Sequence, residues 1–401
     1  GDFFFKFAMR ITKNMHAASA KTAVIFSTLL GMISGSAAGN VAVTGTLTIP
    51  MMKKEGYQNH QAGAIEAVVS TGGQIMPPVM GAAAFIMAEI IGKPYTEVMK
   101  AGLIPALLFF ASTFFVVHFQ AKKNRLKTKI YKDDGESMII VLLNGLQFII
   151  PFFSLIGMML YGYSPFKASF FSIIILLVLN ILWNKKISFD FLINCQKAII
   201  EGTKNVVPIA VACAAAGIIA GTLGITGLGS KISGLILTWS LGIPILALFM
   251  TMIVAIILGM GLPTTAAYLI LATVVAPALS EIGVPMLTAH MFVFFFGCVS
   301  TITPPVALAA YVAAGIAKAK INKVGWTAFA YGTTCYILPF IFFYSPALLL
   351  NDSIYMIFLS IISSLCGVFC ISLFVIGFFK RELNLLFRLI LCLAGIFLLL
   401  Q

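Results

Sequence analysis

Long, nearly uncharged apolar runs constrain this chain more than any other feature of its sequence. A helix that crosses a bilayer needs about 20 mainly apolar residues, and several runs approach or exceed that length. Clear examples are Ala101–Phe119, Met138–Leu160, Phe166–Trp183, Trp326–Tyr344, Tyr355–Phe378 and Leu385–Leu400. Charged residues make up only 10% of the chain, whereas a soluble domain has about a quarter. We therefore expect an all-α polytopic membrane protein.

Two further apolar stretches are interrupted near their middle. Thr22–Met52 has basic residues on both sides, and its centre, Ser34–Asn40, is a run of small and polar residues that form a helix poorly. If both flanks are cytoplasmic, this stretch is a re-entrant hairpin with its tip at membrane depth. Ile243–Ile282 has flanks that are not basic, so we expect it to dip in from outside. If each stretch instead crossed the membrane twice in the ordinary way, the orientation would be the same. The prediction of hairpins therefore depends on the interruption in the middle of each stretch.

The excess of basic residues indicates an orientation. The formal net charge is +13, which in a soluble protein would indicate a nucleic-acid partner. In a membrane protein, Lys and Arg gather instead in cytoplasmic loops. Counting crossings from the first hairpin leaves only Lys93, Lys100, Lys167 and Lys231 outside. This pattern predicts a multi-pass membrane protein with most of its basic loops in the cytoplasm and no nucleic-acid partner.

Two motifs occur twice in the same order. Gly31–Ala38 aligns with Gly259–Ala266 at a shift of 228 residues, and the proline pair Pro77-Pro78 aligns with Pro304-Pro305 at a shift of 227. Two motifs at almost one offset indicate an internal repeat. Because the two copies enter from opposite sides in the predicted topology, they are inverted repeats, which are typical of secondary transporters.

The repeat predicts how the chain is divided. We expect a first repeat at 1–119 (hairpin 22–52, broken helix 63–91), connecting scaffold helices at 120–195, a second repeat at 196–345 (hairpin 243–282, broken helix 286–317) and extra C-terminal helices at 346–401. Gly1 aligns with Gly229, so the first repeat has no counterpart of the Val206–Leu223 span. We therefore expect further membrane helices upstream of this sequence.

The repeated motifs have the chemistry that an ion or substrate site needs. Proline pairs remove amide donors and unwind a helix, and unwound backbone at membrane depth is tolerated only inside protein or beside a cavity. Its carbonyls and nearby hydroxyls suit Na⁺, and free amides at helix N-termini suit an anion. The alternatives are close packing of helices by small residues and simple proline kinks. Recurrence in both halves favours the functional interpretation.

Other polar residues give weaker signals. Glu66, Glu89 and Glu281 lie in or near membrane segments, where ionisable groups are functional candidates by default. For Glu89 and Glu281, near helix ends, we expect snorkelling, and the role of Glu66 stays open. We expect the four histidines at the interfaces and most of the 35 phenylalanines against lipid.

Catalytic and nucleotide-binding motifs are missing from the sequence. The cysteines and histidines have no metal-ligand spacing, no phosphate-binding loop for ATP occurs, and no signature of an intramembrane protease is present. We therefore expect no enzyme and no organic cofactor. An ion channel fits poorly, because channels usually build one filter from several subunits.

Four runs carry a resemblance to a known family. Gly31–Pro50, Glu66–Glu89, Gly259–Tyr268 and Ser300–Tyr311 resemble the large permease subunit of tripartite ATP-independent periplasmic (TRAP) transporters. The most specific motifs are Gly-Gly-Gln-Ile-Met-Pro-Pro-Val-Met-Gly and Thr-Pro-Pro-Val. The likeness extends from the start of the chain to about Leu350. It is strongest to the branch that works with TAXI-type binding proteins, whose permeases commonly fuse the small and large subunits.

The resemblance implies a mechanism and partners. Hairpins and broken helices would form a transport domain that slides as an elevator, carrying a small carboxylate with Na⁺. A TAXI-type periplasmic binding protein would deliver the substrate, and the small-subunit helices would be fused upstream. The alternative is a Na⁺-coupled carboxylate or anion symporter that needs no binding protein.

The resemblance also implies site residues. The family's ion sites map to Ser34, Ser36, Asn40, Gly72, Gly73 and Met76 in one half, and to Gly261, Thr264, Thr265, Ser300, Thr301 and Thr303 in the other. The substrate would lie near Asn40, Gln74 and Tyr268. Relatives often carry an acidic residue near Asn40 and an Arg for the substrate carboxylate, whereas here Asn40 itself is uncharged and no Arg occurs at depth. H⁺ is therefore an alternative to Na⁺ as the coupling ion.

Overall fold

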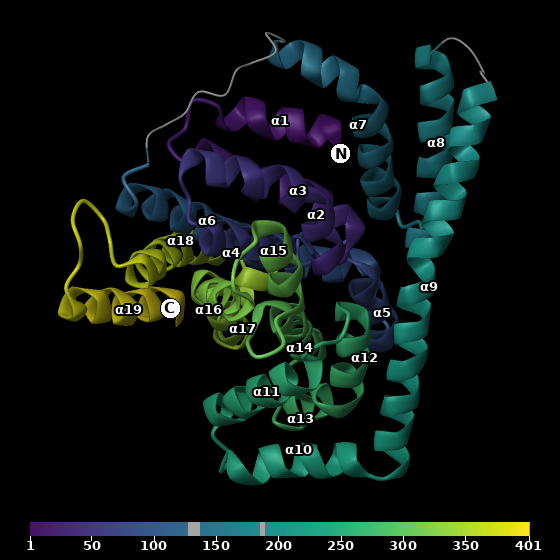
Figure 1. Cartoon of the computed structure of the whole chain (residues 1–401). Helices are drawn as coiled ribbons and strands as arrows, with labels where there is room; N and C mark the ends of the chain where they lie inside the picture. The colour runs from purple at the N-terminus through teal and green to yellow at the C-terminus, as the bar shows by residue number, and fades with distance from the viewer. Residues whose placement is uncertain (127–136, 185–188, 401) are drawn as a thin grey trace.

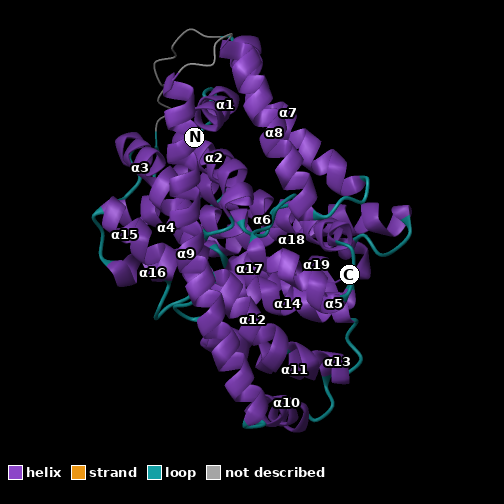
Figure 2. Ribbon diagram, turned by 90° about the vertical axis from the view of Figure 1, so that its right-hand side faces the viewer, coloured by secondary structure: helices purple, strands orange, loops and turns teal. Residues whose placement is uncertain are grey.

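The computed structural model describes residues 1–126, 137–184 and 189–400 (Figure 1). Within these residues the regular structure is helical, apart from one isolated β-bridge between Phe378 and Glu382, and Figure 2 shows helices joined by loops throughout. Six of the described helices are long and apolar enough to cross a membrane: Tyr95–Lys123, Met138–Leu160, Pro165–Trp183, Phe191–Ile225, Ile321–Tyr344 and Ile354–Ile376. The prediction of an all-α polytopic membrane protein is confirmed.

The first repeat begins with a short helix that the sequence did not predict. Its elements are α1 (Asp2–Thr12), α2 (Ala18–Ser34), α3 (Ala37–Glu55), α4 (Asn59–Gly73) and α5 (Ala82–Ile91). Only Gly35 and Ser36 separate α2 from α3. Gly35 has a φ of 64°, which ends α2 with a left-handed residue, and the Ser36 side chain caps α3 by accepting from the Gly39 amide at 3.2 Å. The chain therefore turns back within two residues and forms a helical hairpin.

The second repeat follows the same order, but α12 and α13 together take the place of α3 and a 3₁₀ turn is added after α14. It comprises α10 (Leu228–Trp239), α11 (Pro244–Gly259), α12 (Thr264–Val274), α13 (Ala276–Glu281), α14 (Met286–Val299), the 3₁₀ turn η1 (Ser300–Ile302) and α15 (Leu308–Ala317). A shift of 228 residues places α1 on α10, so this helix also belongs to the repeat. In Figure 1, α1 lies near the top and α10 at the bottom, both across the direction of the long helix α9.

The two repeats interlock through their hairpins. The α2–α3 hairpin packs against α4, and α3 also packs against α15 of the other repeat. The α11–α12 hairpin packs against α14, and α12 also packs against α5 of the first repeat. Each hairpin therefore contacts the first half of its own broken helix and the second half of the other one.

The remaining helices surround this unit. They are α6 (Tyr95–Lys123), α7 (Met138–Leu160), α8 (Pro165–Asn184), α9 (Phe189–Ile225), α16 (Ile321–Tyr331), α17 (Thr333–Tyr344), η2 (Pro346–Leu349), α18 (Ile354–Ile376) and α19 (Leu385–Leu400). The bounds predicted for α7 and α19 are those observed. Helix α9 is much longer than the predicted Val206–Leu223 span, and it packs along α12.

The prediction that phenylalanines face lipid is wrong for an important group. Phe292, Phe294, Phe295 and Phe296 of α14 are fully buried, because α14 lies among α11, α12, α13 and α17. Phe296 stacks edge-on against Phe340 of α17, with ring centroids 6.1 Å apart. These rings form part of the core of the second repeat.

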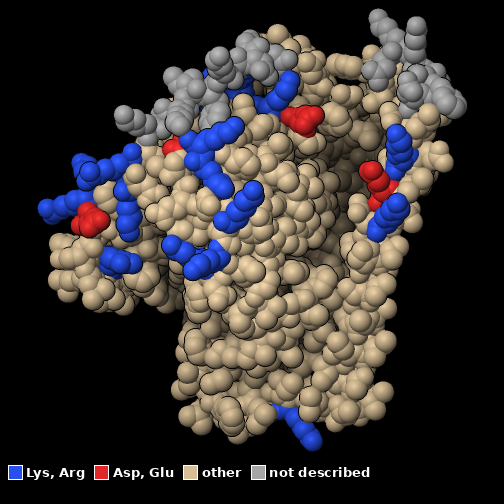
Figure 3. All heavy atoms as spheres, in the orientation of Figure 1, with Lys and Arg blue, Asp and Glu red and all other residues tan. Residues whose placement is uncertain are grey.

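Charge is unevenly distributed over the surface. Figure 3 shows Lys and Arg side chains gathered over the upper half of the visible face, whereas the lower half is almost uncharged. An apolar surface of this kind suits a lipid environment.

Candidate functional site

The tip of each hairpin lies against the break of its own helix. A Cβ on Gly31 of α2 would lie 2.8 Å from the Cα of Gly73 at the end of α4, so the two backbones touch. In the second repeat, a Cβ on Gly259 would lie 3.0 Å from the Ser300 Oγ. Both contacts fall at the aligned positions of the two repeats.

The helix breaks themselves contain the proline pairs. Pro77-Pro78 and Pro304-Pro305 both have cis peptide bonds. Tyr95 Oη donates to the carbonyl of Pro78 at 2.8 Å, and Tyr311 Oη donates to the carbonyl of Pro305. Some of the carbonyls freed by the breaks are therefore held by tyrosines.

The two breaks meet each other through polar side chains. Thr264 Oγ1, at the tip of the second hairpin, donates to Gln74 Oε1 at the break of the first repeat. Thr71 Oγ1 lies 3.0 Å from Thr301 Oγ1. Gln74 is 1% exposed and its Nε2 has no hydrogen-bond partner. An orphan buried donor is uncommon in folded proteins, so this amide is a candidate to hold a ligand.

A buried carboxylate lies within the first repeat. Glu66, the eighth residue of α4, is 0% exposed. Its Oε1 accepts from Ser27 Oγ of α2 at 2.6 Å and from Ser70 Oγ at 3.2 Å, and its carboxylate also accepts from Thr44 and Thr48 of α3. Four hydroxyl groups from three helices therefore surround one acid.

Asn40 links this cluster to the hairpin tip. Its Nδ2 donates to the Ser27 carbonyl at 2.9 Å and to Ser70 Oγ at 3.1 Å. Asn40 is 1% exposed, and its Oδ1 has no partner. Asn40, Thr44 and Thr48 lie four residues apart, which places them on one face of α3. We call Ser27, Asn40, Thr44, Thr48, Glu66 and Ser70 the Glu66 cluster.

Tyr268, which the sequence places with Asn40 and Gln74, lies in a different environment. Its hydroxyl is 2.8 Å from His290 Nδ1, and its ring packs edge-on against Phe294. His290 is buried inside α14, so its predicted place at the interface is wrong. Asn40 and Tyr268 occupy aligned positions in the two repeats, but no hydrogen bond joins the three proposed substrate residues within the described chain.

In the first half, the residues predicted as ion ligands lie in several different environments. Ser34 and Ser36 are exposed at the tip. A Cβ on Gly72 would overlap the ring of Phe109 at 1.9 Å, so this position packs tightly. Met76 is half-buried and lines an apolar groove with Leu107, among other residues.

In the second half most of the predicted ligands are buried. Thr264 and Thr265 are buried, whereas Gly261 is exposed. Ser300 Oγ contacts the carbonyls of Gly259 at 3.0 Å and Gly297 at 2.8 Å. Thr301 bonds the Cys298 carbonyl as well as Thr71, and Thr303 bonds the Val299 carbonyl and Tyr336. No group of three or more His, Cys, Asp or Glu side chains lies together in the described part of the chain.

Sequence reasoning missed most of the Glu66 cluster. Ser27, Thr44, Thr48 and Ser70 received no role, although a signal was present. Hydroxyl or amide side chains recur every four residues on α3, and an acid lies four residues before a serine on α4. Such spacing places polar groups on one helix face.

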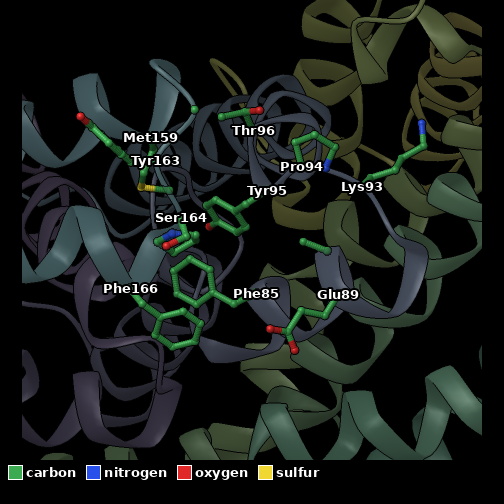
Figure 4. Close-up of a pocket in the computed structure, with 13 residues that line it drawn as sticks. Phe85, Glu89, Lys93, Pro94, Tyr95, Thr96, Met159, Tyr163, Ser164 and Phe166 are labelled. Atoms are coloured by element: carbon green, nitrogen blue, oxygen red, sulfur yellow. The ribbon is translucent and has the colours of Figure 1, made fainter.

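A cavity of about 390 Å³ opens between the α5–α6 corner and the α7–α8 corner. Figure 4 shows the rings of Phe85, Tyr95 and Phe166 close together, with Glu89 and Lys93 set apart from them. Glu89 is exposed, as expected for an acid near a helix end.

Two interlocked repeats, each with a hairpin and a broken helix around buried polar groups, define a membrane permease of the secondary-transporter type. Over residues 1–357 the sequence matches the family described as tripartite ATP-independent periplasmic transporter, DctM component, and the chain belongs to this family. It is a multi-pass inner-membrane permease. Permeases of this family work with a periplasmic binding protein and a small subunit.

Individual relatives are similar at low identity. The chain is 21% identical over 344 residues to a putative TRAP transporter large permease protein of Haemophilus influenzae, covering 85% of this chain and 79% of that protein. It is 24% identical over 331 residues to the 2,3-diketo-L-gulonate TRAP transporter large permease protein YiaN of Escherichia coli, covering 82% and 76%. It is also 24% identical over 300 residues to the isethionate TRAP transporter permease protein DctMQ of Oleidesulfovibrio alaskensis, covering 73% and 45%.

Proposed function

We propose that this chain is the permease part of a TRAP-type secondary transporter that imports a small organic acid with a cation gradient. A TAXI-like periplasmic binding protein delivers the substrate. Membership of the DctM family supports the permease role. The names of two relatives, which refer to 2,3-diketo-L-gulonate and isethionate, support a small organic anion as cargo.

The observation that carries the proposal is the polar contact between the helix break of the first repeat and the hairpin tip of the second. Gln74 and Thr264 bond across the repeats in a buried setting, and the Gln74 amide has an unused donor. An amide donor and free backbone N–H groups at helix N-termini hold a carboxylate without a full positive charge. This chemistry fits the fact that the two hairpins and broken helices contain no arginine.

We propose that a coupling cation, Na⁺, binds near the hairpin tips. Ser36 at the first tip and Thr264 at the second contribute hydroxyls, and the unwound backbone contributes carbonyls. Because the hairpins and broken helices interlock across the repeats, they move as one unit in an elevator step against the surrounding helices.

The test uses the complete permease with its small-subunit helices, reconstituted in proteoliposomes with the purified binding protein. The cargo is first identified as the acid that most raises the melting temperature of the binding protein, from a panel of small organic acids including 2,3-diketo-L-gulonate and isethionate. We expect uptake that needs the binding protein and a cation gradient but not ATP. Full uptake without the binding protein would contradict the proposal and favour the simple symporter.

A matched pair of variants tests the site. Gln74→Glu replaces the amide donor by a carboxylate of the same size, which repels an anion, so we expect loss of uptake. Gln58→Glu makes the same change at the exposed start of α4 and should leave uptake unchanged. Equal uptake by both variants would show that Gln74 does not take part in binding the substrate.

A further inference from the structure

We propose that the Glu66 cluster binds a proton that the transporter carries with its cargo, in addition to the cation at the hairpin tips, a role that rests on the proposed transport function. Glu66 lies fully buried between α2, α3 and α4, and all four of its side-chain hydrogen bonds come from hydroxyl groups. The cluster is separate from the polar contacts of Gln74 with Thr264 and of Thr71 with Thr301.

No cationic side chain compensates the acid among the described residues. On its own three helices, the nearest ionisable groups along the chain are Lys21, six residues before Ser27, Lys53, five after Thr48, and His60, six before Glu66. Such separations correspond to about 7–9 Å along a helix. An unpaired carboxylate at membrane depth is costly, so a neutral, protonated form of Glu66 is the one that burial favours.

The other helices that contact this region contribute no partner either. Their titratable and charged groups are Asp2, Lys6 and Arg10 on α1, Tyr311 on α15, Lys323 and Tyr331 on α16, Tyr95, Glu97, Lys100, His118, Lys122 and Lys123 on α6, and His290 and Cys298 on α14, while Lys54 and Glu55 follow Lys53 on α3 itself. None of them hydrogen-bonds to Glu66. On the side of α15 the apolar side chain of Ile316 lies close by: a Cβ on Gly45 would lie 3.3 Å from both Glu66 Cγ and Ile316 Cδ1.

Counting hydrogens shows that the cluster has room for one more proton. Thr44 Oγ1 lies 2.7 Å from the Asn40 carbonyl, and Thr48 Oγ1 lies 2.9 Å from the Thr44 carbonyl, in addition to their contacts with Glu66. Ser27 Oγ also lies 3.0 Å from Thr44 Oγ1. A hydroxyl has only one hydrogen to donate. A proton on Glu66 therefore lets Thr44 or Thr48 keep its carbonyl bond while accepting from the carboxyl.

The packing of the cluster favours a proton over a metal cation. The hydroxyl oxygens of Ser27, Thr44 and Thr48 contact the carboxylate directly. A Na⁺ ion would have to separate these oxygens to reach the acid, whereas a proton occupies an existing O···O contact. The geometry thus accommodates H⁺ without rearrangement.

Asn40 connects the acid to the hairpin tip. It lies four residues beyond Ser36 and bonds Ser70, which in turn bonds Glu66. Its amide is also next to the Gly31–Gly73 contact, since a Cβ on Gly31 would lie 2.9 Å from Asn40 Nδ2. A change in the protonation of Glu66 is therefore passed to the tip through two hydrogen bonds.

The proposed step is a simple exchange of one proton. The O–H bond of Glu66 forms with a proton from the periplasmic side as cargo loads. It breaks on the cytoplasmic side as cargo leaves, so one proton moves inward with each cargo molecule and the carboxylate is regenerated.

The first test needs no cargo. Infrared spectra of the complete purified permease should contain the C=O stretch of a buried protonated carboxyl, which Glu66→Gln lacks and Glu201→Gln, at an exposed acid on α9, retains. Thr48→Val removes a hydrogen bond and keeps the acid, so it should shift this band. A spectrum without the band over the whole stable pH range, or with the band unchanged in Glu66→Gln, would overturn the proposal.

The second test separates coupling from transport itself. In proteoliposomes with the binding protein and equal Na⁺ on both sides, an inward proton gradient should drive uptake of the identified cargo by the wild type. Glu66→Gln mimics the protonated acid, so it should keep exchange of cargo across the membrane and lose accumulation driven by the proton gradient. Equal proton-driven accumulation by the wild type and Glu66→Gln, or accumulation by the wild type on a Na⁺ gradient but none on a proton gradient, would overturn the proton role and leave the transport function standing. Failure of the wild type under every gradient would instead contradict the transport function.

Discussion

The two repeats share one backbone arrangement but differ in the chemistry of their interiors. At the shifts of 227 and 228 residues, the acid and the hydroxyl residues of the Glu66 cluster align with small or apolar residues in the second repeat: Ser27 with Ala255, Thr44 with Ala272, Thr48 with Ala276, Glu66 with Val293 and Ser70 with Gly297. Helices of the same order and contacts form in both halves. The hairpin and broken helix therefore do not need a buried acid to fold, and the polar set of the first half is a separate feature.

The second repeat has a smaller polar pair of its own. Tyr268 aligns with Asn40, and it bonds His290 of α14 among phenylalanine rings. One hydrogen bond between aromatic side chains thus stands where the first repeat has a cluster of six polar residues. The second half is built mainly as an apolar core.

The largest loss of stability is expected when an acid equivalent to Glu66 is introduced into the second repeat. Val293→Glu buries a carboxyl among alanines and phenylalanines without hydroxyl partners, at a cost of about 3 kcal/mol or more. We expect little monodisperse protein in size-exclusion chromatography of detergent extracts. Val293→Ala, which only removes volume, is the control and should be recovered. Normal recovery of Val293→Glu would show that the second interior is not apolar in the membrane.

A methyl group at the hairpin contact should distinguish the two repeats. Gly31→Ala places a Cβ 2.8 Å from the backbone of Gly73, which cannot rotate away, so we expect a loss of about 1–3 kcal/mol. Gly259→Ala meets the Ser300 Oγ at 3.0 Å, and this side chain can turn. Melting temperatures in detergent should therefore fall more for Gly31→Ala. Equal losses would mean that the two contacts are equally rigid.

A smaller effect is expected at the polar pair of the second repeat. Tyr268→Phe removes the hydroxyl that contacts His290 and leaves the ring in place, which should cost about 1 kcal/mol. A double-mutant cycle with His290→Ala measures the pairwise contribution through melting temperatures. Additive losses would show that the two side chains do not interact.

The smallest change in stability is expected when Glu66 and its hydroxyl partners are replaced by the residues that align with them in the second repeat. The combined variant Ser27→Ala, Thr44→Ala, Thr48→Ala, Glu66→Val and Ser70→Gly removes the acid together with all its hydroxyl partners. Replacing a whole buried polar set by apolar residues is often neutral, so we expect a change within about 1 kcal/mol in thermal melting and a loss of proton-driven uptake. Retained proton-driven uptake would contradict the role proposed for the acid.

Much of this arrangement follows from the sequence, for physical reasons. The long apolar runs and the repeated Gly31 and Gly259 motifs are local patterns, and they predict spans and helix breaks directly. The partners of Glu66 come from three helices, so only their packing brings Ser27 and Thr48 to the same acid. The burial of His290 and of the α14 phenylalanines likewise depends on which helices surround α14, which composition does not specify.

The bond between Thr264 and Gln74 has a consequence for how the molecule is assembled. Each repeat supplies only one side of this junction, and the Thr71–Thr301 pair is divided in the same way. Half of the duplicated chain would leave these groups facing lipid or water. The junction is therefore completed only after both halves have been inserted, so the last step of its formation must wait until η1, which contributes Thr301, has left the ribosome.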